Sequence, residues 1–205
     1  MTEDEARDWI FDRFGVPRGT LVERYAKVLA SEAGHQNLIS ASTASSLWTR
    51  HLLDSAQLIF HGDSYSGSWM DVGSGAGLPG MVVAALTDRQ VILVEPRKKR
   101  AAFLQHCADE LGIADRVAVH AAAVERLTPL SPTIISARAV APLGRLLIDV
   151  SRQLTSTTLC VFPKGRTAES EVAAARETWH GDFQLMPSVT DPDARIVLIR
   201  RAALR

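Results

Sequence analysis

The chain has 205 residues, of which 46% are hydrophobic and 22% charged, and its 23 basic and 23 acidic side chains cancel to a formal net charge of zero. This is the composition of a soluble globular protein, and the balanced charge excludes one that coats nucleic acid through bulk positive charge. Cys107 and Cys160 have neither metal-ligand nor redox spacing, so we expect reduced thiols and no metal site in a cytoplasmic protein. The acidic start M-T-E-D-E and the lack of a long apolar run predict neither a secretion signal nor a membrane span.

Helical periodicity dominates the first 60 residues. Apolar side chains recur one turn apart between Trp9 and Phe14 and between Leu21 and Leu29, and Ser45–Phe60 is predicted as a third helix. The turn-forming segment H-G-D-S-Y-S-G-S follows. We therefore expect residues 1–60 to form a helical region that packs on a core domain of residues 68–205, the two making a single structural unit.

From residue 69 onward, short apolar runs alternate with helical patterns. The expected strands are Trp69–Val72, Val91–Glu95, Arg116–His120, Thr133–Ala137, Thr158–Phe162, Phe183–Val189 and Ala194–Arg201. One expected helix begins near Pro79. Three others span Lys98–Leu111, Leu143–Leu154 and Glu169–Trp179. This order predicts an α/β fold with a mainly parallel sheet, helices on both faces and an antiparallel edge strand. Ligands of such sheets bind at the carboxyl ends of the strands, so the loops that follow the strands are the places to look for a site.

The first of these loops, D-V-G-S-G-A-G-L-P-G, fits two cofactor templates. Gly75, Gly77 and Gly80 match the G-x-G-x-x-G pattern of dinucleotide-binding proteins. Gly73, Gly75 and Gly77, two residues after Asp71, match the acid-x-G-x-G-x-G loop of class I methyltransferases. A carboxylate is unfavourable beside a pyrophosphate, whereas S-adenosylmethionine carries a sulfonium, an ammonium and no phosphate. Asp71 therefore favours the methyl donor.

Two further acids follow neighbouring strands. Glu95 ends the second strand, about 20 residues after the loop, where a carboxylate accepts hydrogen bonds from ribose hydroxyls of either cofactor. Glu125, in A-A-V-E-R-L, follows the third strand, where methyltransferases commonly contact adenine. We predict a class I methyltransferase domain with a Rossmann-like sheet, and keep a nicotinamide-dependent oxidoreductase as an alternative.

The group that accepts the methyl is constrained by the motifs that the chain lacks. The segment S-A-R-A-V-A-P-L does not contain the Asn/Asp-Pro-Pro-aromatic run of amine methyltransferases, and neither cysteine is placed as a nucleophile for pyrimidine carbon five. Guanine N7 has a free lone pair and no proton to remove, so its methylation needs alignment rather than a general base. The residues also leave open a small-molecule or protein acceptor, and a non-catalytic module that binds cofactor or RNA.

Basic residues gather near the predicted ligand edge. Arg138 directly follows the fourth strand, and Arg50 lies on the third predicted helix. The other candidates for RNA phosphate contacts are Arg97, Lys98, Lys99, Arg100, Lys164 and Arg166. We expect these side chains to form a basic cleft for RNA.

Several segments occur in the order expected for one family. They are R-H-L-L-D-S (Arg50–Ser55), D-V-G-S-G-A-G-L-P-G, V-E (Val124–Glu125), S-A-R-A-V-A (Ser136–Ala141) and P-K-G (Pro163–Gly165). From about Asn37 onward the chain resembles the bacterial ribosomal RNA small-subunit methyltransferase G family, also called glucose-inhibited division protein B. The resemblance implies S-adenosylmethionine-dependent methylation of N7 of a guanine, guanine 527, in 16S rRNA. The implied partner is 16S rRNA or the small ribosomal subunit, and we expect a monomer.

The resemblance also implies roles for individual residues. By matching position, the cofactor contacts are Gly73, Leu78, Val124, Glu125 and Arg138, of which Arg138 positions the reactants without acting as a base. Asp71, Gly75, Gly77 and Glu95 fit the general class I pattern.

Other positions are less settled by the resemblance. His51 and Asp54 stand one helical turn apart, as either a surface pair or a contact at the RNA or cofactor edge. The chain keeps Asn37 and Leu38 of an upstream family segment but has Ile39, and Phe162-Pro163-Lys164-Gly165 replaces a Leu-Lys-Gly run.

Overall fold

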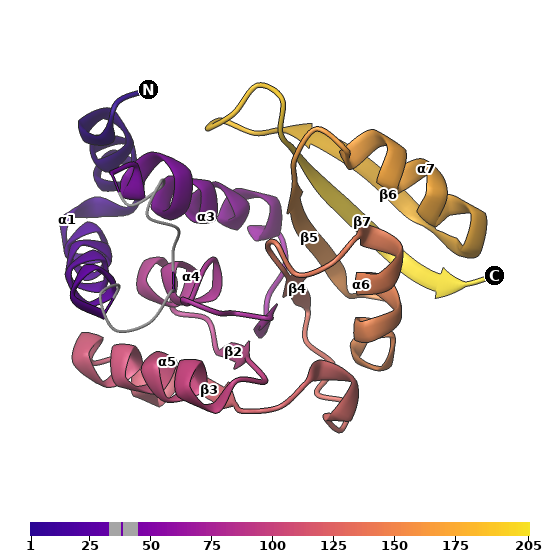
Figure 1. Cartoon of the computed structure of the whole chain (residues 1–205), viewed down its shortest axis with the longest axis horizontal. Coiled ribbons are helices and arrows are strands. Elements are labelled where there is room, and N and C mark those ends of the chain that lie inside the picture. The colour runs from indigo at the N-terminus through magenta and orange to yellow at the C-terminus, as the bar shows by residue number, and fades with distance from the viewer. Residues whose placement is uncertain (33–37, 39–44) are drawn as a thin grey trace.

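A computed structural model describes residues 1–32, 38 and 45–205, and a seven-stranded sheet runs through it between two groups of helices (Figure 1). The strands are β1 (Trp69–Val72), β2 (Val91–Val94), β3 (Val117–His120), β4 (Ile134–Ser136), β5 (Leu159–Lys164), β6 (Trp179–Pro187) and β7 (Arg195–Leu204). Their order in the sheet is β3-β2-β1-β4-β5-β7-β6. The first five strands are parallel to their neighbours, and β7 is antiparallel to both β5 and β6. The predicted fold class is confirmed, with β6 outermost and β7 inserted between it and β5.

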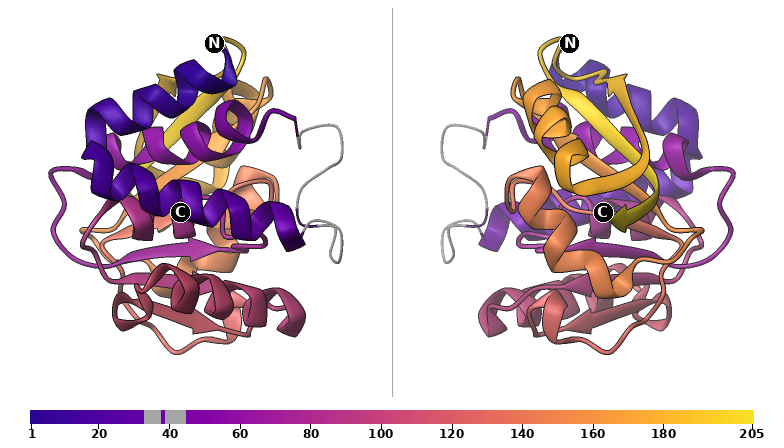
Figure 2. Two further views of the ribbon diagram at one scale, coloured as in Figure 1. Left: turned by 90° about the vertical axis from the view of Figure 1, so that its left-hand side faces the viewer. Right: turned by 90° about the vertical axis from the view of Figure 1, so that its right-hand side faces the viewer.

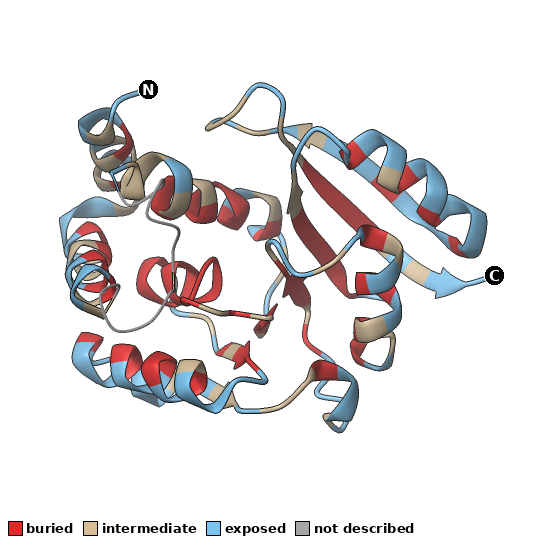
Figure 3. Ribbon diagram, in the orientation of Figure 1, coloured by how far each residue is buried: buried red, intermediate tan, exposed pale blue. Residues whose placement is uncertain are grey.

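The helices cover the two faces of the sheet separately. On one face lie α1 (Glu3–Glu32), α4 (Gly80–Leu86) and α5 (Lys98–Leu111), and on the other lie α6 (Leu143–Val150) and α7 (Ala168–Thr178). The two side views in Figure 2 face these two groups in turn. Each face has its own apolar cluster, and the central strands β1, β4 and β5 are buried on both sides, whereas the outermost strand β6 is largely exposed (Figure 3). This explains why the central strands read as continuous apolar runs rather than alternating ones.

Most predicted elements are present within a few residues. The structure confirms α5 as predicted, because Gly112 adopts a left-handed conformation (φ 69°) directly after Leu111 and ends the helix. Helix α6 ends at Val150 and continues as the 3-10 turn η5 (Ser151–Gln153). Trp179, predicted as the last residue of a helix, instead begins β6.

The amino-terminal region is less regular than predicted. The two helices expected there form one element, α1, with a kink at Gly15. The third expected helix is divided into a π-helical turn η1 (Trp48–Leu53), a short α3 (Asp54–Ala56) and a 3-10 turn η2 (Gln57–Gly62). Asn37 and Ile39 lie outside the described residues.

Helix α1 is built into the main apolar core. Its side chains Ile10, Val22, Tyr25 and Leu29 are buried in the same cluster as those of α4 and α5. The amino-terminal helices therefore share a core with the sheet.

Candidate functional site

A cavity of about 830 Å³ opens at the carboxyl ends of β1, β4 and β5. Its walls come from the glycine loop, from η1, from the segments that follow β4 and β5, and from the loop between β6 and β7. The predicted site residues that line it are Arg50, His51, Gly73, Gly75, Leu78, Arg100, Arg138 and Lys164. This volume falls in the usual range for small-molecule sites, about 300–1,000 Å³.

The glycine loop depends on backbone conformations that favour glycine. Gly73, Gly75 and Gly77 have φ values of 67°, 56° and 99°. A Cβ atom on Gly73 would also lie 2.6 Å from a methyl carbon of Val140, which lines the same cavity. The backbone N–H of Gly73 donates to the Val94 carbonyl at 2.8 Å, which joins the loop to the end of β2.

Asp71 lies beneath this loop rather than on the cavity wall. It is fully buried, and its carboxylate accepts hydrogen bonds from the Ser136 hydroxyl (2.7 Å) and the Gly80 N–H (3.1 Å). Burial raises the pKa of Asp71 to about 6, against the effect of these hydrogen bonds. Asp71 thus holds the loop against β4, and its role in binding the cofactor stays a prediction.

The cavity walls also change the electrostatic argument. The cationic lining side chains are Arg50, Arg100, Arg138, Lys164 and Arg195, and the anionic ones are Asp54, Glu171 and Asp191. Walls with this excess of cations do not disfavour a pyrophosphate. The carboxylate argument for the methyl donor consequently loses its force, and the choice of cofactor depends on other evidence.

Glu95 lies at the loop, where its position in the sequence predicts it. Its carboxylate is almost entirely buried and accepts from the N–H groups of Gly75 and Arg97, both at 2.9 Å. Val124 is buried at the start of the 3-10 turn η4 (Val124–Arg126), and Glu125 is exposed. Neither of these two residues is among those that line the cavity.

Arg138 is held by the helix that carries the H-x-x-D-S motif. Its guanidinium donates to the Arg50 carbonyl (3.1 Å), lies 3.4 Å from the Asp54 carboxylate and is 3.1 Å from His51 Nδ1. Burial, with the nearby Arg138 and Arg50, lowers the pKa of His51 to about 4. His51 is thus neutral near pH 7, and its Nδ1 accepts the hydrogen bond from Arg138. His51 and Asp54 share a role: both position Arg138.

The same helix is fastened to the loop between β6 and β7. The Asp54 carboxylate accepts from the Thr190 hydroxyl at 2.8 Å, and the Gln57 side-chain carbonyl accepts from the Val189 N–H at 2.8 Å. Neither contact has a signal in the sequence, because the partners are separated by 136 and 132 residues. Tyr25 was also missed: its hydroxyl donates to the Ala76 carbonyl at 2.5 Å and supports the glycine loop.

The predicted basic cleft is smaller than expected. Lys164 donates to the Ala141 carbonyl at 2.6 Å and forms a 3.0 Å ion pair with Glu171, so its charge is already compensated inside the protein. Arg166 is exposed beside Asp193, at 3.7 Å, and is not among the lining residues.

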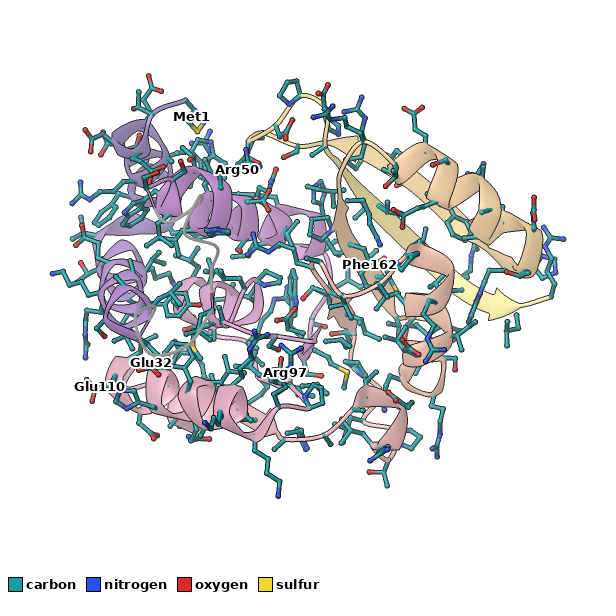
Figure 4. All side chains as sticks on the ribbon, in the orientation of Figure 1. Met1, Glu32, Arg50, Arg97, Glu110 and Phe162 are labelled. Carbon is teal, nitrogen blue, oxygen red and sulfur yellow. The ribbon has the colours of Figure 1, made fainter. Side chains whose placement is uncertain are left out.

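The R-K-K-R segment is also largely separate from the cavity. Arg97, Lys98 and Lys99 are exposed at the start of α5, whereas Arg100 reaches the cavity wall. Figure 4 shows Arg97 well apart from Arg50. The structure therefore brings Arg50, Arg100 and Arg138 to the cavity and leaves the other predicted cations outside it or paired within its wall.

Neither cysteine is suited to nucleophilic catalysis. Both are buried, and burial raises the pKa of Cys107 and of Cys160 to about 12, so the thiolate is scarce at neutral pH. Within the described ranges, no group of three or more His, Cys, Asp and Glu side chains is arranged to hold a metal ion. In the same part of the chain, no helix combines the length and apolar character required to cross a membrane.

Solved structures with the same fold include several methyltransferases. A ribosomal protein L11 methylase from Lactobacillus delbrueckii subsp. bulgaricus superposes with a TM-score of 0.59 at 15% identity, covering 74% of this chain and 78% of that one. A mutant of MtNAS, solved in complex with S-adenosylmethionine, also gives 0.59 at 15% identity, covering 90% of this chain and 76% of that one. At these identities the similarity concerns the fold, which is that of class I methyltransferases.

Proteins related by sequence have a much higher identity to this chain than these solved structures have. A ribosomal RNA small subunit methyltransferase G from Rhizorhabdus wittichii is 50% identical over 202 residues, covering 97% of this chain and 92% of the relative. The namesake proteins of Zymomonas mobilis and Cereibacter sphaeroides are 38% and 40% identical, covering 97% and 99% of this chain and 93% and 99% of the relatives. Residues 19–195 match the family model described as rRNA small subunit methyltransferase G, GidB. The chain therefore belongs to the rRNA small subunit methyltransferase G family and is an rRNA methyltransferase.

Proposed function

We propose that the cavity binds S-adenosylmethionine and that the protein methylates N7 of a guanine in 16S rRNA, guanine 527 by family resemblance. The observation that carries this proposal is that the segments matching the methyltransferase G family, namely the glycine loop, the H-x-x-D-S helix and Arg138, come together as walls of one cavity. The substrate is 16S rRNA, free or within the small ribosomal subunit, and the enzyme acts as a monomer in the cytoplasm.

The residues present fit this cofactor. At Gly75 an added Cβ would meet no atom closer than 3.7 Å, so the loop backbone there is open to a ligand, and Gly73 and Leu78 line the same wall. The Glu95 carboxylate is an acceptor for ribose hydroxyls. By the resemblance, Val124 and Glu125 contact the cofactor, and Glu125 follows the strand after which methyltransferases commonly contact the adenine. Gly77 and Asp71 serve the cofactor by holding the loop in its conformation.

The chemistry needs orientation more than proton transfer. When bound, S-adenosylmethionine supplies a methyl group activated by a positively charged sulfur. Guanine N7 already carries the lone pair that attacks, so the residues need only align it. Arg138, immobilised by His51 and Asp54, is the side chain that we assign to this alignment.

RNA phosphates are neutralised by cations around the cavity. Arg50 and Arg100 line the cavity, and Arg97, Lys98, Lys99 and Arg166 extend the positive surface outside it. Residues 1–60 and 68–205 work together as one structural unit. Arg138 lies in the second region, and Asp54, which holds it, lies in the first.

The experiment supplies radiolabelled S-adenosylmethionine and small ribosomal subunits or 16S rRNA from cells that lack this protein. We expect label in an N7-methylguanine. Arg138→Ala should lower the rate at least tenfold without unfolding the protein, since it removes charged hydrogen bonds at the site. Arg145→Ala is the control, because Arg145 is exposed and already paired with Asp149.

Other outcomes would contradict the proposal. Label in a protein or metabolite with none in rRNA would assign a different acceptor. Binding of donor and RNA without product would indicate a non-catalytic module. Tight binding of reduced nicotinamide cofactor in a fluorescence titration would replace the methyl donor altogether.

A further inference from the structure

A second hollow, of about 520 Å³, lies at the far end of the β6–β7 hairpin. We call it the hairpin hollow; it is lined by the end of α7, by residues 179–184 of β6 and by Arg200 and Arg205. On β7, Arg195 pairs with Lys164 at the carboxyl end of β5 and lines the functional cavity, whereas Arg200 pairs with Leu159 at the opposite end. Five residues of strand separate the two positions, about 17 Å.

The arginines of the hairpin hollow are not neutralised. Among the described residues, no carboxylate lies within ion-pair distance of Arg176 or Arg200. Asp182, the acid in the lining, is paired with Arg201. The hollow therefore carries an excess of positive charge.

Neutral acceptors hold these guanidinium groups in place. Arg200 donates to the Tyr65 hydroxyl (2.8 Å) and to the Gln184 side chain (3.0 Å). Arg176 donates to the Phe183 carbonyl at 3.2 Å, and Arg205 donates to the Arg176 carbonyl at 3.0 Å. Each guanidinium has five N–H donors, so these contacts orient the groups and leave donors for a ligand.

Trp179 adds an unsatisfied donor to the same place. It lines the hollow, is only 2% exposed, and its indole N–H has no hydrogen-bond partner among the described residues. A buried donor without an acceptor is unusual in a folded protein, and an acceptor supplied by a ligand would satisfy it.

We propose that the hairpin hollow binds the phosphate backbone of rRNA and forms a second RNA contact, at the opposite end of the sheet from the methyl-transfer cavity. Guanidinium groups pair with phosphate oxygens through two hydrogen bonds at once, and phosphate oxygens are also acceptors for the Trp179 N–H. The identity of the ligand as RNA rests on the proposed function. Arg200 and Arg205 lie outside residues 19–195, so the family match does not include this contact.

The test compares binding of a 16S rRNA transcript by wild type and Arg176→Gln/Arg200→Gln at several salt concentrations. We expect affinity to fall on the order of tenfold. The slope of log affinity against log salt should become shallower by about one to two, one for each lost phosphate contact. Affinity for S-adenosylmethionine should not change, because the hollow is remote from the cavity.

Two further variants control for charge and folding. Arg18→Gln/Arg145→Gln removes the same charge from arginines already paired with Asp88 and Asp149, and should bind RNA as wild type does. Arg176→Lys/Arg200→Lys keeps both charges and should keep the salt slope. Thermal unfolding confirms that each variant is folded.

The proposal is overturned if Arg176→Gln/Arg200→Gln matches wild type in both affinity and salt slope. It is equally overturned if RNA binding is intact and only binding to the assembled subunit is lost, since the partner would then be a protein. Failure of the proposed function looks different: the wild type would bind RNA without methylating it, while the effect of the two arginines on RNA binding would remain.

Discussion

At the scale of single residues, the glycine loop shows how a missing side chain shapes the cavity. Gly73→Ala would place a methyl group 2.6 Å from Val140 in a left-handed backbone conformation. Such a conformation costs about 1–2 kcal/mol for a residue other than glycine, so we expect lower stability and weaker binding of S-adenosylmethionine in calorimetry. Gly144→Ala is the matched control: its Cβ meets nothing within 4 Å, and alanine in helix α6 should leave stability equal or improved. Undiminished cofactor affinity in Gly73→Ala would refute this role of the loop.

The raised pKa of the Asp71 carboxyl group predicts that the stability of the protein depends on pH. Its pKa is raised from 3.8 to about 6 by burial, so between these values the folded state binds a proton that the unfolded state has released. The stabilisation that the protonated Asp71 gives the folded state is therefore fully present below about pH 3.8 and is lost as the pH rises through 6. The whole change in the free energy of unfolding is about 3 kcal/mol.

Urea unfolding of wild type and Asp71→Asn across this pH range measures the effect. The free energy of unfolding of wild type, relative to the variant, should decrease by most of this amount, about 2 kcal/mol, between pH 4 and pH 7. A constant difference between the two proteins would show that the Asp71 carboxylate does not titrate in this range.

At the scale of elements, the fastening of the amino-terminal helices to the β6–β7 loop determines where Arg138 lies. Gln57 is 4% exposed, and its side-chain carbonyl accepts a hydrogen bond from the Val189 N–H. Gln57→Ala leaves that donor without its partner, so we expect a loss of about 1–3 kcal/mol in unfolding free energy and faster hydrogen exchange at Val189. Gln105→Ala, which removes an exposed side chain bonded to Asp109, should change stability by less than about 0.5 kcal/mol. Equal effects of the two changes would contradict the structural role of Gln57.

Elements with local stop signals were the most predictable. Helix α5 ends where Gly112 predicts, because its left-handed conformation is a property of glycine itself. The division of residues 48–62 into π, α and 3-10 turns had no such signal. That irregular path coincides with the contacts of Asp54 and Gln57 to the distant β6–β7 loop, which local sequence does not encode.

At the scale of the whole molecule, the amino-terminal helices and the sheet share one apolar core. Deleting residues 1–32 would expose the faces of α4 and α5 that Val22, Tyr25 and Leu29 cover, and would remove the Tyr25 support of the glycine loop. We expect this truncated chain to lose cooperative thermal unfolding, measured by circular dichroism. Deleting residues 1–2 alone removes only the cap that Thr2 forms with Glu5, which costs about 1 kcal/mol, and should leave the transition cooperative. A cooperative transition in the larger truncation would show that the two regions fold independently.

The sequence by itself determined the order of strands and helices, the glycine loop and the family. These depend on hydrophobic periodicity, on glycine conformation and on matched segments, all of which are local properties of the chain. The positions of Asp71 and Lys164 were decided only by the tertiary structure, which turned one carboxylate inward against Ser136 and paired the lysine with Glu171. Likewise, His51 and Asp54 meet Arg138 across 87 and 84 residues of sequence. The direction in which a charged side chain points depends on packing between distant segments, and no local pattern records it.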